Sequence, residues 1–166
     1  VLIYGASGAL GTTAVQLAKY FGAEVTGVCS TANVALVKSL GADKVIDYTK
    51  EDFSKSGEIY DVVFETVGKA SVADCKKVLT ENGIFLQGSA SLGQMLQGLW
   101  MAMSTRKKVF GGVIKETASD MDFLASLLES GKLIATIDKT YSLAQMKEAH
   151  EYVDGGHKRG NVVVRV

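Results

Sequence analysis

The residues whose spacing most clearly predicts chemistry are three glycines, Gly5, Gly8 and Gly11, in the segment VLIYGASGALG. An apolar stretch leads into them, and a helical pattern follows at once. A strand that ends in such a turn points several backbone N–H groups, and the positive end of the following helix, at one spot. That spot suits a pyrophosphate, because the glycines provide a tight turn, room for a ligand at the backbone and close contact between helix and sheet. Ala6 stands where the commoner fingerprint has its first glycine, so the context of the motif has to support this prediction.

A second group of polar residues follows the next apolar run, AEVTGVCS. In dinucleotide-binding folds, an Asp or Glu at the tip of the second strand holds the ribose 2′-hydroxyl of NAD. Here the tip is Ser30 and Thr31, and the nearest acids in the sequence are Glu24, at the other end of the strand, and Asp43, beyond the next helix. A carboxylate would repel a 2′-phosphate, so its absence at the tip favours NADP over NAD. Ser30, Thr31 and Asn33 can donate hydrogen bonds to a phosphate, although the first two also suit an ordinary helix N-cap.

Residue types that often carry catalysis or hold metals show no matching spacing. Cys29 and Cys75 form neither a Cys-x-x-Cys pair nor a Cys/His cluster, so the sequence predicts no metal site and no disulfide framework. His150 lies in a helical stretch and His157 in a polar GGHKRG loop, and neither has a sequence partner that would make it a general base. The sequence therefore identifies no catalytic residue.

Alternating apolar strands and helical patterns must position these groups. The helix after the glycine turn has its apolar residues on one face, and Gly22 stands at its C-terminal end. A second helix is predicted over residues 32–40. The alternation predicts an α/β fold of the Rossmann type, a doubly wound parallel sheet with strand order 3-2-1-4-5-6. The predicted strands cover residues 1–4, 23–30, 43–48, 60–68, 83–89 and 107–114.

Composition limits the function classes. The chain has 166 residues, which fits one domain of about 100–200 residues. Its formal net charge is zero, so the basic surface of a nucleic-acid-binding protein is not expected. No apolar run approaches the roughly 20 residues that a membrane span needs. We expect a cytoplasmic protein with neither nucleic acid nor membrane as partner. The chain begins inside its first strand, which indicates a piece of a longer protein.

Six apolar residues between the fifth and sixth predicted strands recur at helical spacing. One interpretation is a helix face buried on the sheet or in a subunit contact. The other is an apolar wall beside a nicotinamide, suited to a hydrophobic acceptor. The six residues are Leu92, Met95, Leu96, Leu99, Trp100 and Met103.

Six segments together carry a family resemblance along the whole chain: GASGALG, AKYFGAEVTGVCST, LGADKVIDY, DVVFETVG, GKLIATIDKTYSL and EAHEYVDGGHKRGNVVV. Their order resembles the medium-chain dehydrogenase/reductase superfamily, above all its zinc-independent branch of quinone oxidoreductases and zeta-crystallin. The resemblance implies a dinucleotide-binding domain over residues 1–134. It also implies a C-terminal segment, residues 135–166, that completes a GroES-like catalytic domain absent from this chain. The 166-residue chain would then bind its cofactor without turnover.

The resemblance implies transfer of a hydride from NADPH to a quinone or to an activated alkene or carbonyl. The alternatives are a non-catalytic NADPH-binding or structural protein of crystallin type, and a zinc-dependent alcohol dehydrogenase. Expected partners are a small-molecule acceptor and a second copy of the chain, in a homodimer that pairs through strand 107–114. Short-chain dehydrogenases are disfavoured, because no tyrosine is followed four residues later by lysine.

The resemblance also extends the expected cofactor site. Tyr48 and Lys158 would approach a 2′-phosphate, with Arg159 as an alternative cation. The turn after the fourth strand would lie on the adenosine side, and the ends of the fifth and sixth strands on the nicotinamide side. The complete set of expected contacts is Gly8, Ala9, Leu10, Ser30, Thr31, Asn33, Tyr48, Thr66, Val67, Gly88, Ser89, Phe110, Gly111 and Lys158.

Overall fold

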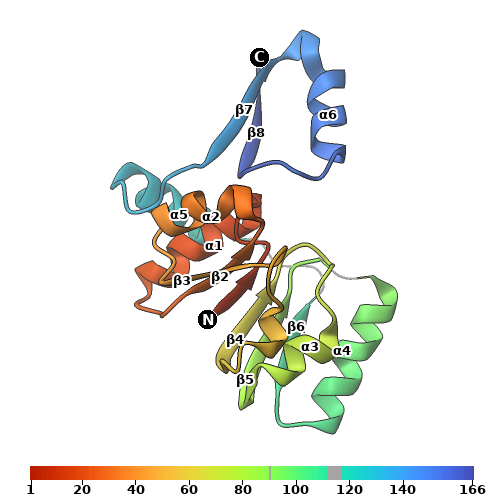
Figure 1. Ribbon diagram of the computed structural model, residues 1–166. Coiled ribbons are helices and arrows are strands. Elements are labelled where there is room, and N and C mark those ends of the chain that lie inside the picture. Colours follow the sequence, from red (N-terminus) through yellow and green to blue (C-terminus); the bar gives the residue numbers. More distant parts are fainter. Residues whose placement is uncertain (90, 112–116) are drawn as a thin grey trace.

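The computed structural model describes residues 1–89, 91–111 and 117–166, and its centre is a six-stranded sheet (Figure 1). The strands are β1 (Leu2–Tyr4), β2 (Thr26–Cys29), β3 (Lys44–Asp47), β4 (Tyr60–Glu65), β5 (Leu79–Gln87) and β6 (Lys108–Gly111). They lie in the order β3-β2-β1-β4-β5-β6, and every neighbouring pair is parallel. The predicted strand order and the Rossmann-type fold are therefore confirmed.

Apolar side chains of alternating strand residues form a core on each face of this sheet. Leu2 points to the face covered by α3 (Val72–Lys77) and α4 (Leu92–Ser104), whereas Ile3 points to the face covered by α1 (Ala9–Tyr20) and α2 (Val34–Ser39). Figure 1 shows the two helix pairs on opposite sides of the strands. The sheet is doubly wound, as its apolar strands predict.

Some element boundaries differ from the prediction. β5 begins at Leu79, four residues before the predicted start, and pairs with Tyr60 across a register shift in β4. A 3₁₀ turn over Thr31–Asn33 replaces the first residues of the second predicted helix. β6 runs from Lys108 to Gly111, one residue after the predicted start, and residues 112–114 of the predicted strand fall outside the described residues.

α4 turns a different face to the sheet from the one predicted. Gly98 and Met101 are buried, whereas Leu96, Trp100 and Met103 of the apolar stripe are exposed. A Cβ on Gly98 would lie 2.9 Å from the Gln87 side chain, so this glycine lets the helix approach the strands closely. The interpretation that the stripe is buried on the sheet is wrong, because its six residues are exposed and Gly98 and Met101 are buried instead.

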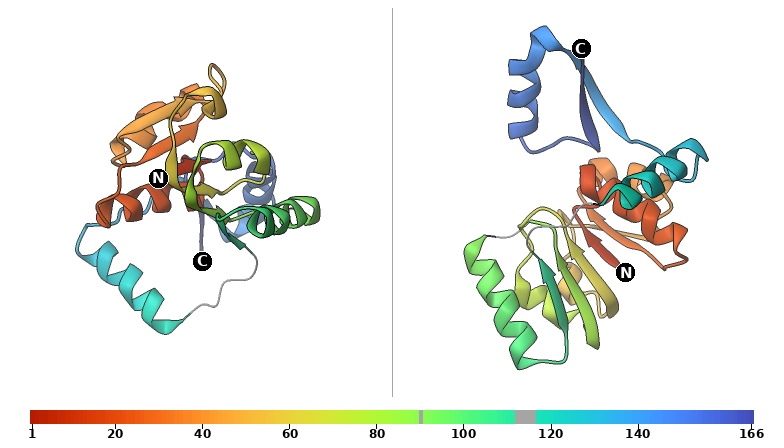
Figure 2. Two further views of the ribbon diagram at one scale, coloured as in Figure 1. Left: turned by 90° about the horizontal axis from the view of Figure 1, so that it is seen from below. Right: turned by 180° about the vertical axis from the view of Figure 1, so that it is seen from behind.

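The chain ends in a separate unit, residues 137–166, that we call the C-terminal unit. It holds β7 (Ile137–Ser142) and β8 (Asn161–Arg165) in a two-stranded parallel sheet, with α6 (Met146–Asp154) between them along the chain. The helix α5 (Ala118–Glu129) precedes this unit. Figure 2 shows the C-terminal unit standing beyond the six-stranded sheet. The predicted domain boundary after residue 134 stays a prediction.

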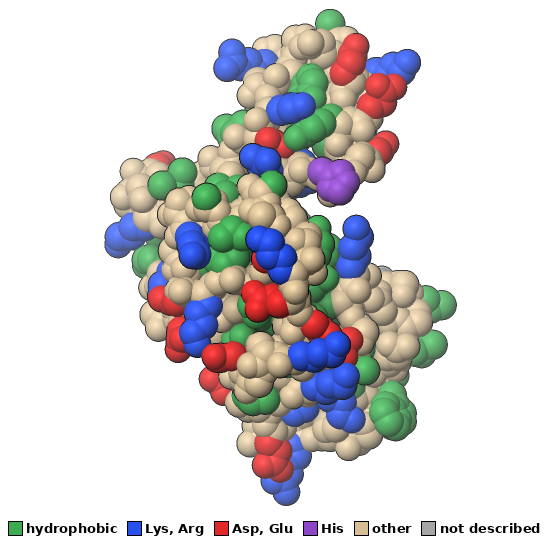
Figure 3. All heavy atoms as spheres, in the orientation of Figure 1, with side chains coloured by type: hydrophobic (Ala, Val, Ile, Leu, Met, Phe, Trp, Pro, Cys, Tyr) green, Lys and Arg blue, Asp and Glu red, His purple; other side chains and the backbone are tan. Residues whose placement is uncertain are grey.

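The surface carries both signs of charge. Figure 3 shows Lys and Arg side chains interspersed with Asp and Glu over the visible face, in keeping with the zero formal net charge. Among the described residues, the helices are too short or too polar to cross a lipid bilayer.

Candidate dinucleotide-binding site

The turn after β1 gives its three glycines different roles. Gly5 has a φ of +85°, and a Cβ there would lie 2.5 Å from the Thr66 hydroxyl oxygen. A Cβ on Gly11 would lie 2.1 Å from the carbonyl oxygen of Gly5, so α1 can approach the turn only with glycine at this position. On Gly8, the nearest atom to a Cβ would be 3.5 Å away, an ordinary contact. Internal packing thus requires Gly5 and Gly11 but not Gly8, where a side chain would fill the space in front of the turn.

α1 starts at this turn without a side chain to cap it. Ser71, Ser91 and Thr117 accept hydrogen bonds from first-turn N–H groups of α3, α4 and α5, whereas α1 follows Gly8 and has no acidic residue in its first turn. The first N–H groups of a helix have no partner within the helix, and the helix dipole places partial positive charge there. The open space at Gly8 therefore lies where the backbone can bind an anion.

Asn33 joins the end of β2 to the glycine turn. Its side-chain nitrogen donates hydrogen bonds to the hydroxyl oxygens of Ser7, at 3.1 Å, and Ser30, at 3.2 Å. Because both hydroxyls accept here, each can donate its own proton to a ligand. Within the described part of the chain, Asn33 Oδ1 is buried without a hydrogen-bond partner, although most buried polar side-chain atoms are paired. Ser7, which sequence reasoning missed, thus joins Ser30 and Asn33 in a polar cluster that a ligand could complete.

A carboxylate lies beside this cluster, contrary to the expectation of an acid-free tip. Asp47 pairs in register with Cys29, and it accepts hydrogen bonds from the hydroxyls of Thr31, at 2.5 Å, and Thr49, at 2.7 Å. The ammonium of Lys50 is 3.4 Å away. The hydrogen bond from Thr31, helped by Thr49 and Lys50, outweighs burial and holds the pKa of Asp47 far below its ordinary value. The carboxylate therefore stays charged at neutral pH.

Thr31 accordingly differs from its expected role at the tip. Its hydroxyl proton is directed at Asp47, so in this arrangement it is not offered to a phosphate. Ser30 keeps a free hydroxyl proton, because its oxygen accepts from Asn33. Of the two hydroxyls predicted at the tip, only that of Ser30 is available as a donor.

Tyr48 lies just beyond Asp47 at the same edge of the sheet. Its backbone N–H donates to the carbonyl oxygen of Cys29 at 3.0 Å, and its ring is exposed. With Tyr4 and residues 49–53 it lines a hollow of about 390 Å³. The contacts of the described residues do not join its ring to Ser30, so its approach to a 2′-phosphate stays a prediction.

The turn after β4 supports the glycine turn from the other side. Thr66 donates its hydroxyl proton to the carbonyl oxygen of Tyr4 at 2.8 Å. The buried carboxylate of Glu65 accepts hydrogen bonds from three successive backbone N–H groups, those of residues 67–69, at 3.1, 2.7 and 3.2 Å. Thr66 thus holds the turn, whereas the Val67 side chain is partly exposed. Sequence reasoning missed Glu65, which looks like an ordinary strand residue until the turn folds back on it.

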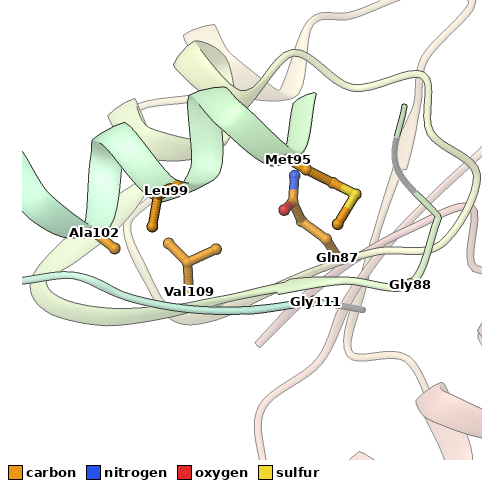
Figure 4. Close-up of a pocket in the computed structure, with 7 residues that line it drawn as sticks. All are labelled: Gln87, Gly88, Met95, Leu99, Ala102, Val109 and Gly111. Atoms are coloured by element: carbon orange, nitrogen blue, oxygen red, sulfur yellow. The ribbon is translucent and has the colours of Figure 1, made fainter. Parts of the chain in front are cut away.

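A cavity of about 310 Å³ opens between α4 and the ends of β5 and β6 (Figure 4). Figure 4 shows Leu99 and Val109 pointing toward each other, and Met95 beside the Gln87 amide. Gly88 and Gly111 of the predicted set line this cavity, and Ser89 and Phe110 are exposed next to them in the chain. Gln87, Ala102 and Val109 were not predicted as site residues. The lining residues are Gln87, Gly88, Met95, Leu99, Ala102, Val109 and Gly111.

Lys158 is linked to the glycine turn through Gly160 of the C-terminal unit. Its ammonium donates to the carbonyl oxygen of Gly160 at 3.0 Å, and the Gly160 N–H donates to the carbonyl oxygen of Ser7 at 2.8 Å. Gly8 and Gly160 also form a parallel bridge. A cation from the end of the sequence therefore lies on Gly160, the residue that bonds to the glycine turn at its beginning.

The remaining titratable candidates carry no catalytic arrangement. Burial raises the pKa of Cys29 to about 11 and that of Cys75 to about 12, so both thiols are protonated at neutral pH. His150 and His157 are exposed. Across residues 1–89, 91–111 and 117–166, no group of three or more His, Cys, Asp or Glu side chains could hold a metal ion.

Comparisons with known proteins agree with this geometry. The profile of a family described as zinc-binding dehydrogenase matches residues 40–164. The chain is 31% identical to mouse NAD(P)H oxidoreductase RTN4IP1, mitochondrial, over 99% of this chain and 47% of the relative. It is 33% identical to the chloroplastic quinone-oxidoreductase QR1 of Triphysaria versicolor, over 99% of this chain and 51% of the relative.

The fold of the whole chain also matches a solved structure. The quinone oxidoreductase from Coxiella burnetii superimposes with a TM-score of 0.90 at 30% identity, covering 99% of this chain and 52% of that one. This chain thus spans about half the length of the relatives that it matches.

Proposed function

Because the chain belongs to the zinc-binding dehydrogenase family, in the quinone oxidoreductase branch of the medium-chain dehydrogenase/reductase superfamily, we propose that it is the cofactor-binding part of an oxidoreductase. The enzyme transfers a hydride from a nicotinamide nucleotide to a quinone or to an activated alkene or carbonyl. The observation that carries this proposal is the space at Gly8, in front of an uncapped helix and beside hydroxyl donors. A pyrophosphate fits this combination of backbone donors and open space.

NADPH is the preferred nucleotide in this proposal. Ser7 and Ser30 each have a hydroxyl proton to donate, and the Lys158 ammonium contacts Gly160, which bonds to the same turn. These groups suit the extra phosphate that distinguishes NADPH from NADH. Asp47 opposes this preference, but its charge is compensated by the donors that surround it.

A bound nicotinamide nucleotide supplies the hydride, and the protein orients it and excludes water. The first turn of α1 and the Asn33 cluster hold the adenosine and phosphate half. Gly88 and Gly111 line the cavity at the ends of β5 and β6, where the nicotinamide half would lie. The apolar side chains of Met95, Leu99 and Val109 suit a hydrophobic acceptor such as a quinone.

The acceptor site needs a second wall in this proposal. Residues 135–166 would pack against a catalytic domain, as the family resemblance implies, and that domain would cover the nicotinamide. Without that domain, an acceptor is not oriented. The lowering of the activation barrier by proximity, up to about 7–11 kcal/mol, is then largely lost. We therefore expect this 166-residue chain to bind nucleotide without appreciable quinone reduction.

A homodimer is also part of the proposal. β6 lies at the edge of the six-stranded sheet, and an unpaired edge strand readily pairs with a second chain. The strand predicted over residues 107–114 would meet its symmetry copy antiparallel. Light scattering at micromolar concentration would show a dimer, and a monomer under those conditions would count against this arrangement.

Zinc chemistry is not part of this proposal for the chain. The matched family is described as zinc-binding, but the described residues hold no cluster of suitable ligands. The groups around Gly8 are backbone amides, hydroxyls and the Asn33 side-chain amide, which are phosphate partners rather than zinc ligands. The nearby Asp47 carboxylate is taken up by Thr31, Thr49 and Lys50.

Titration of NADPH and NADH into the chain tests the proposed function. We expect NADPH to bind more tightly, and Ser30→Asp to reverse the order, because a carboxylate repels a 2′-phosphate and accepts a hydrogen bond from a ribose 2′-hydroxyl. Ser119→Asp adds the same charge on α5 and should leave the order unchanged. Equal or tighter binding of NADH by the unmodified chain would contradict the NADPH assignment.

A further inference from the structure

The loop between α6 and β8, residues 155–160, is tied down at two points. At one, the Asp138 carboxylate accepts hydrogen bonds from the Arg159 backbone N–H, at 2.8 Å, and the Tyr152 hydroxyl, at 2.6 Å. At the other, the Gly160 N–H donates to the carbonyl oxygen of Ser7 in the glycine turn. Asp138 thus fixes the residue directly after Lys158, while Gly160 fixes the loop to the cofactor edge of the sheet.

The backbone at Gly160 leaves this loop little freedom. Gly160 has a φ of +78°, and a Cβ there would lie 2.4 Å from the carbonyl oxygen of Thr136. The same Thr136 oxygen accepts a hydrogen bond from the Asn161 N–H at 2.8 Å. The two residues that follow Lys158 are therefore both held, Arg159 by the Asp138 carboxylate and Gly160 by the carbonyl oxygen of Ser7.

The charges around Asp138 favour its ionised form. Burial opposes ionisation, but the hydrogen bonds from Tyr152 and Arg159, with the nearby cations of Lys139 and Arg159, lower the pKa of Asp138 overall. The Lys139 ammonium also lies 3.7 Å from the centre of the Tyr152 ring and packs that ring against β7. The carboxylate that holds the loop is thus charged, and its hydroxyl partner is itself fixed.

We propose that Asp138, with Tyr152, is a positioning residue that holds Lys158 at the glycine turn to pair with a phosphate of the bound cofactor. The inference rests on the proposed function. Lys158 is half-buried and its ammonium is already directed at the Gly160 carbonyl, next to the turn that binds phosphate. A flexible lysine would lose side-chain entropy on binding, and a loop fixed in advance reduces that cost.

Nucleotide titrations of matched variants test the proposal. Lys158→Ala should weaken binding about tenfold, as expected for the loss of one charge-assisted contact. Asp138→Asn should weaken it several-fold, and Tyr152→Phe less. The double variant should be no weaker than Lys158→Ala alone, because Asp138 acts through that lysine. Asp154→Asn removes an exposed carboxylate from α6 and serves as the control, with unchanged affinity expected.

Two further readouts separate positioning from general damage to the fold. The salt dependence of the dissociation constant should become shallower in Asp138→Asn, as in Lys158→Ala. Amide exchange at Arg159, without nucleotide, should be faster in Asp138→Asn and unchanged in Asp154→Asn. If Lys158→Ala loses more affinity for NADPH than for NADH, Lys158 pairs with the 2′-phosphate. If it loses the same affinity for both nucleotides, Lys158 pairs with the pyrophosphate. Both results support the proposal.

Unchanged affinity in Asp138→Asn, or losses that add in the double variant, would overturn the inference and leave the proposed function intact. A wild-type chain that binds neither nucleotide would instead contradict the proposed function itself, and this inference with it. Circular dichroism of each variant shows whether the fold is kept, and Tyr152→Phe provides a second variant if Asp138→Asn fails to fold.

Discussion

Single contacts at the end of β2 decide what this tip can offer a ligand. The Asn33 amide leaves the hydroxyl protons of Ser7 and Ser30 free, whereas the Thr31 hydroxyl donates its hydrogen bond to Asp47. Sequence reasoning identified Ser30, Thr31 and Asn33 from their position after a predicted strand. It missed Asp47, because that contact depends on the register between β2 and β3, which places Cys29 opposite Asp47. Ser30 and Thr31 are neighbours in the chain, but only Ser30 has a hydroxyl proton free for a ligand.

The depressed pKa of Asp47 predicts how stability depends on pH. A carboxyl group whose pKa is lower in the folded state stabilises the fold fully above its unfolded pKa of about 3.9, and this contribution is lost as pH falls below that value. The free-energy difference of unfolding between wild type and Asp47→Asn should therefore be constant from about pH 7 to pH 5 and shrink toward pH 3.

Urea denaturation at each pH measures this difference, with Asp154→Asn as an exposed control. If the difference between wild type and Asp47→Asn were the same at pH 3 and pH 7, the ion pairing and hydrogen bonding assigned to Asp47 would be wrong.

Helices and strands were predicted best where apolar residues recur at a regular spacing. The order of the six strands followed from apolar runs that alternate with helical patterns, and the structure confirms it. The buried face of α4 could not be predicted in this way. The apolar stripe of α4 is exposed, whereas Gly98 lies against β5. Glycine allows this close approach because it has no side chain. A search for apolar residues therefore does not detect it.

The packing of α1 on the turn after β1 predicts that adding one methyl group at Gly11 lowers stability far more than adding one at Gly8. We expect Gly11→Ala to lower the free energy of unfolding by about 1–3 kcal/mol, the usual cost of overpacking, because the new Cβ meets backbone atoms. Gly8→Ala should change it by less than about 1 kcal/mol, because its φ of −79° suits alanine and its surroundings are open. Urea denaturation of the two variants compares them directly, and equal destabilisation would contradict the roles assigned to these glycines.

At the scale of the whole molecule, the end of the chain returns to its beginning. Gly160 contacts Ser7, and the Gln16 side chain exchanges two hydrogen bonds with the backbone of Ile134, at 3.0 and 2.8 Å. The family resemblance implies that Lys158 contacts the cofactor, which stays a prediction. It did not identify Asp138 or Gln16, because these polar residues acquire their partners only through contacts between segments far apart in the sequence. The candidate cofactor site therefore depends on contacts between distant segments as well as on the glycine motif.

The most direct test of the central claim is calorimetric titration of NADPH into wild type and Gly8→Ala, with the stability of both proteins measured alongside. If the space at Gly8 receives a pyrophosphate, wild type should bind NADPH. Gly8→Ala should then bind NADPH at least about tenfold more weakly, because its methyl group occupies the space of the ligand. Its stability should be nearly unchanged, because the methyl group does not clash with the protein. A Gly8→Ala protein that binds NADPH as tightly as wild type would contradict the account.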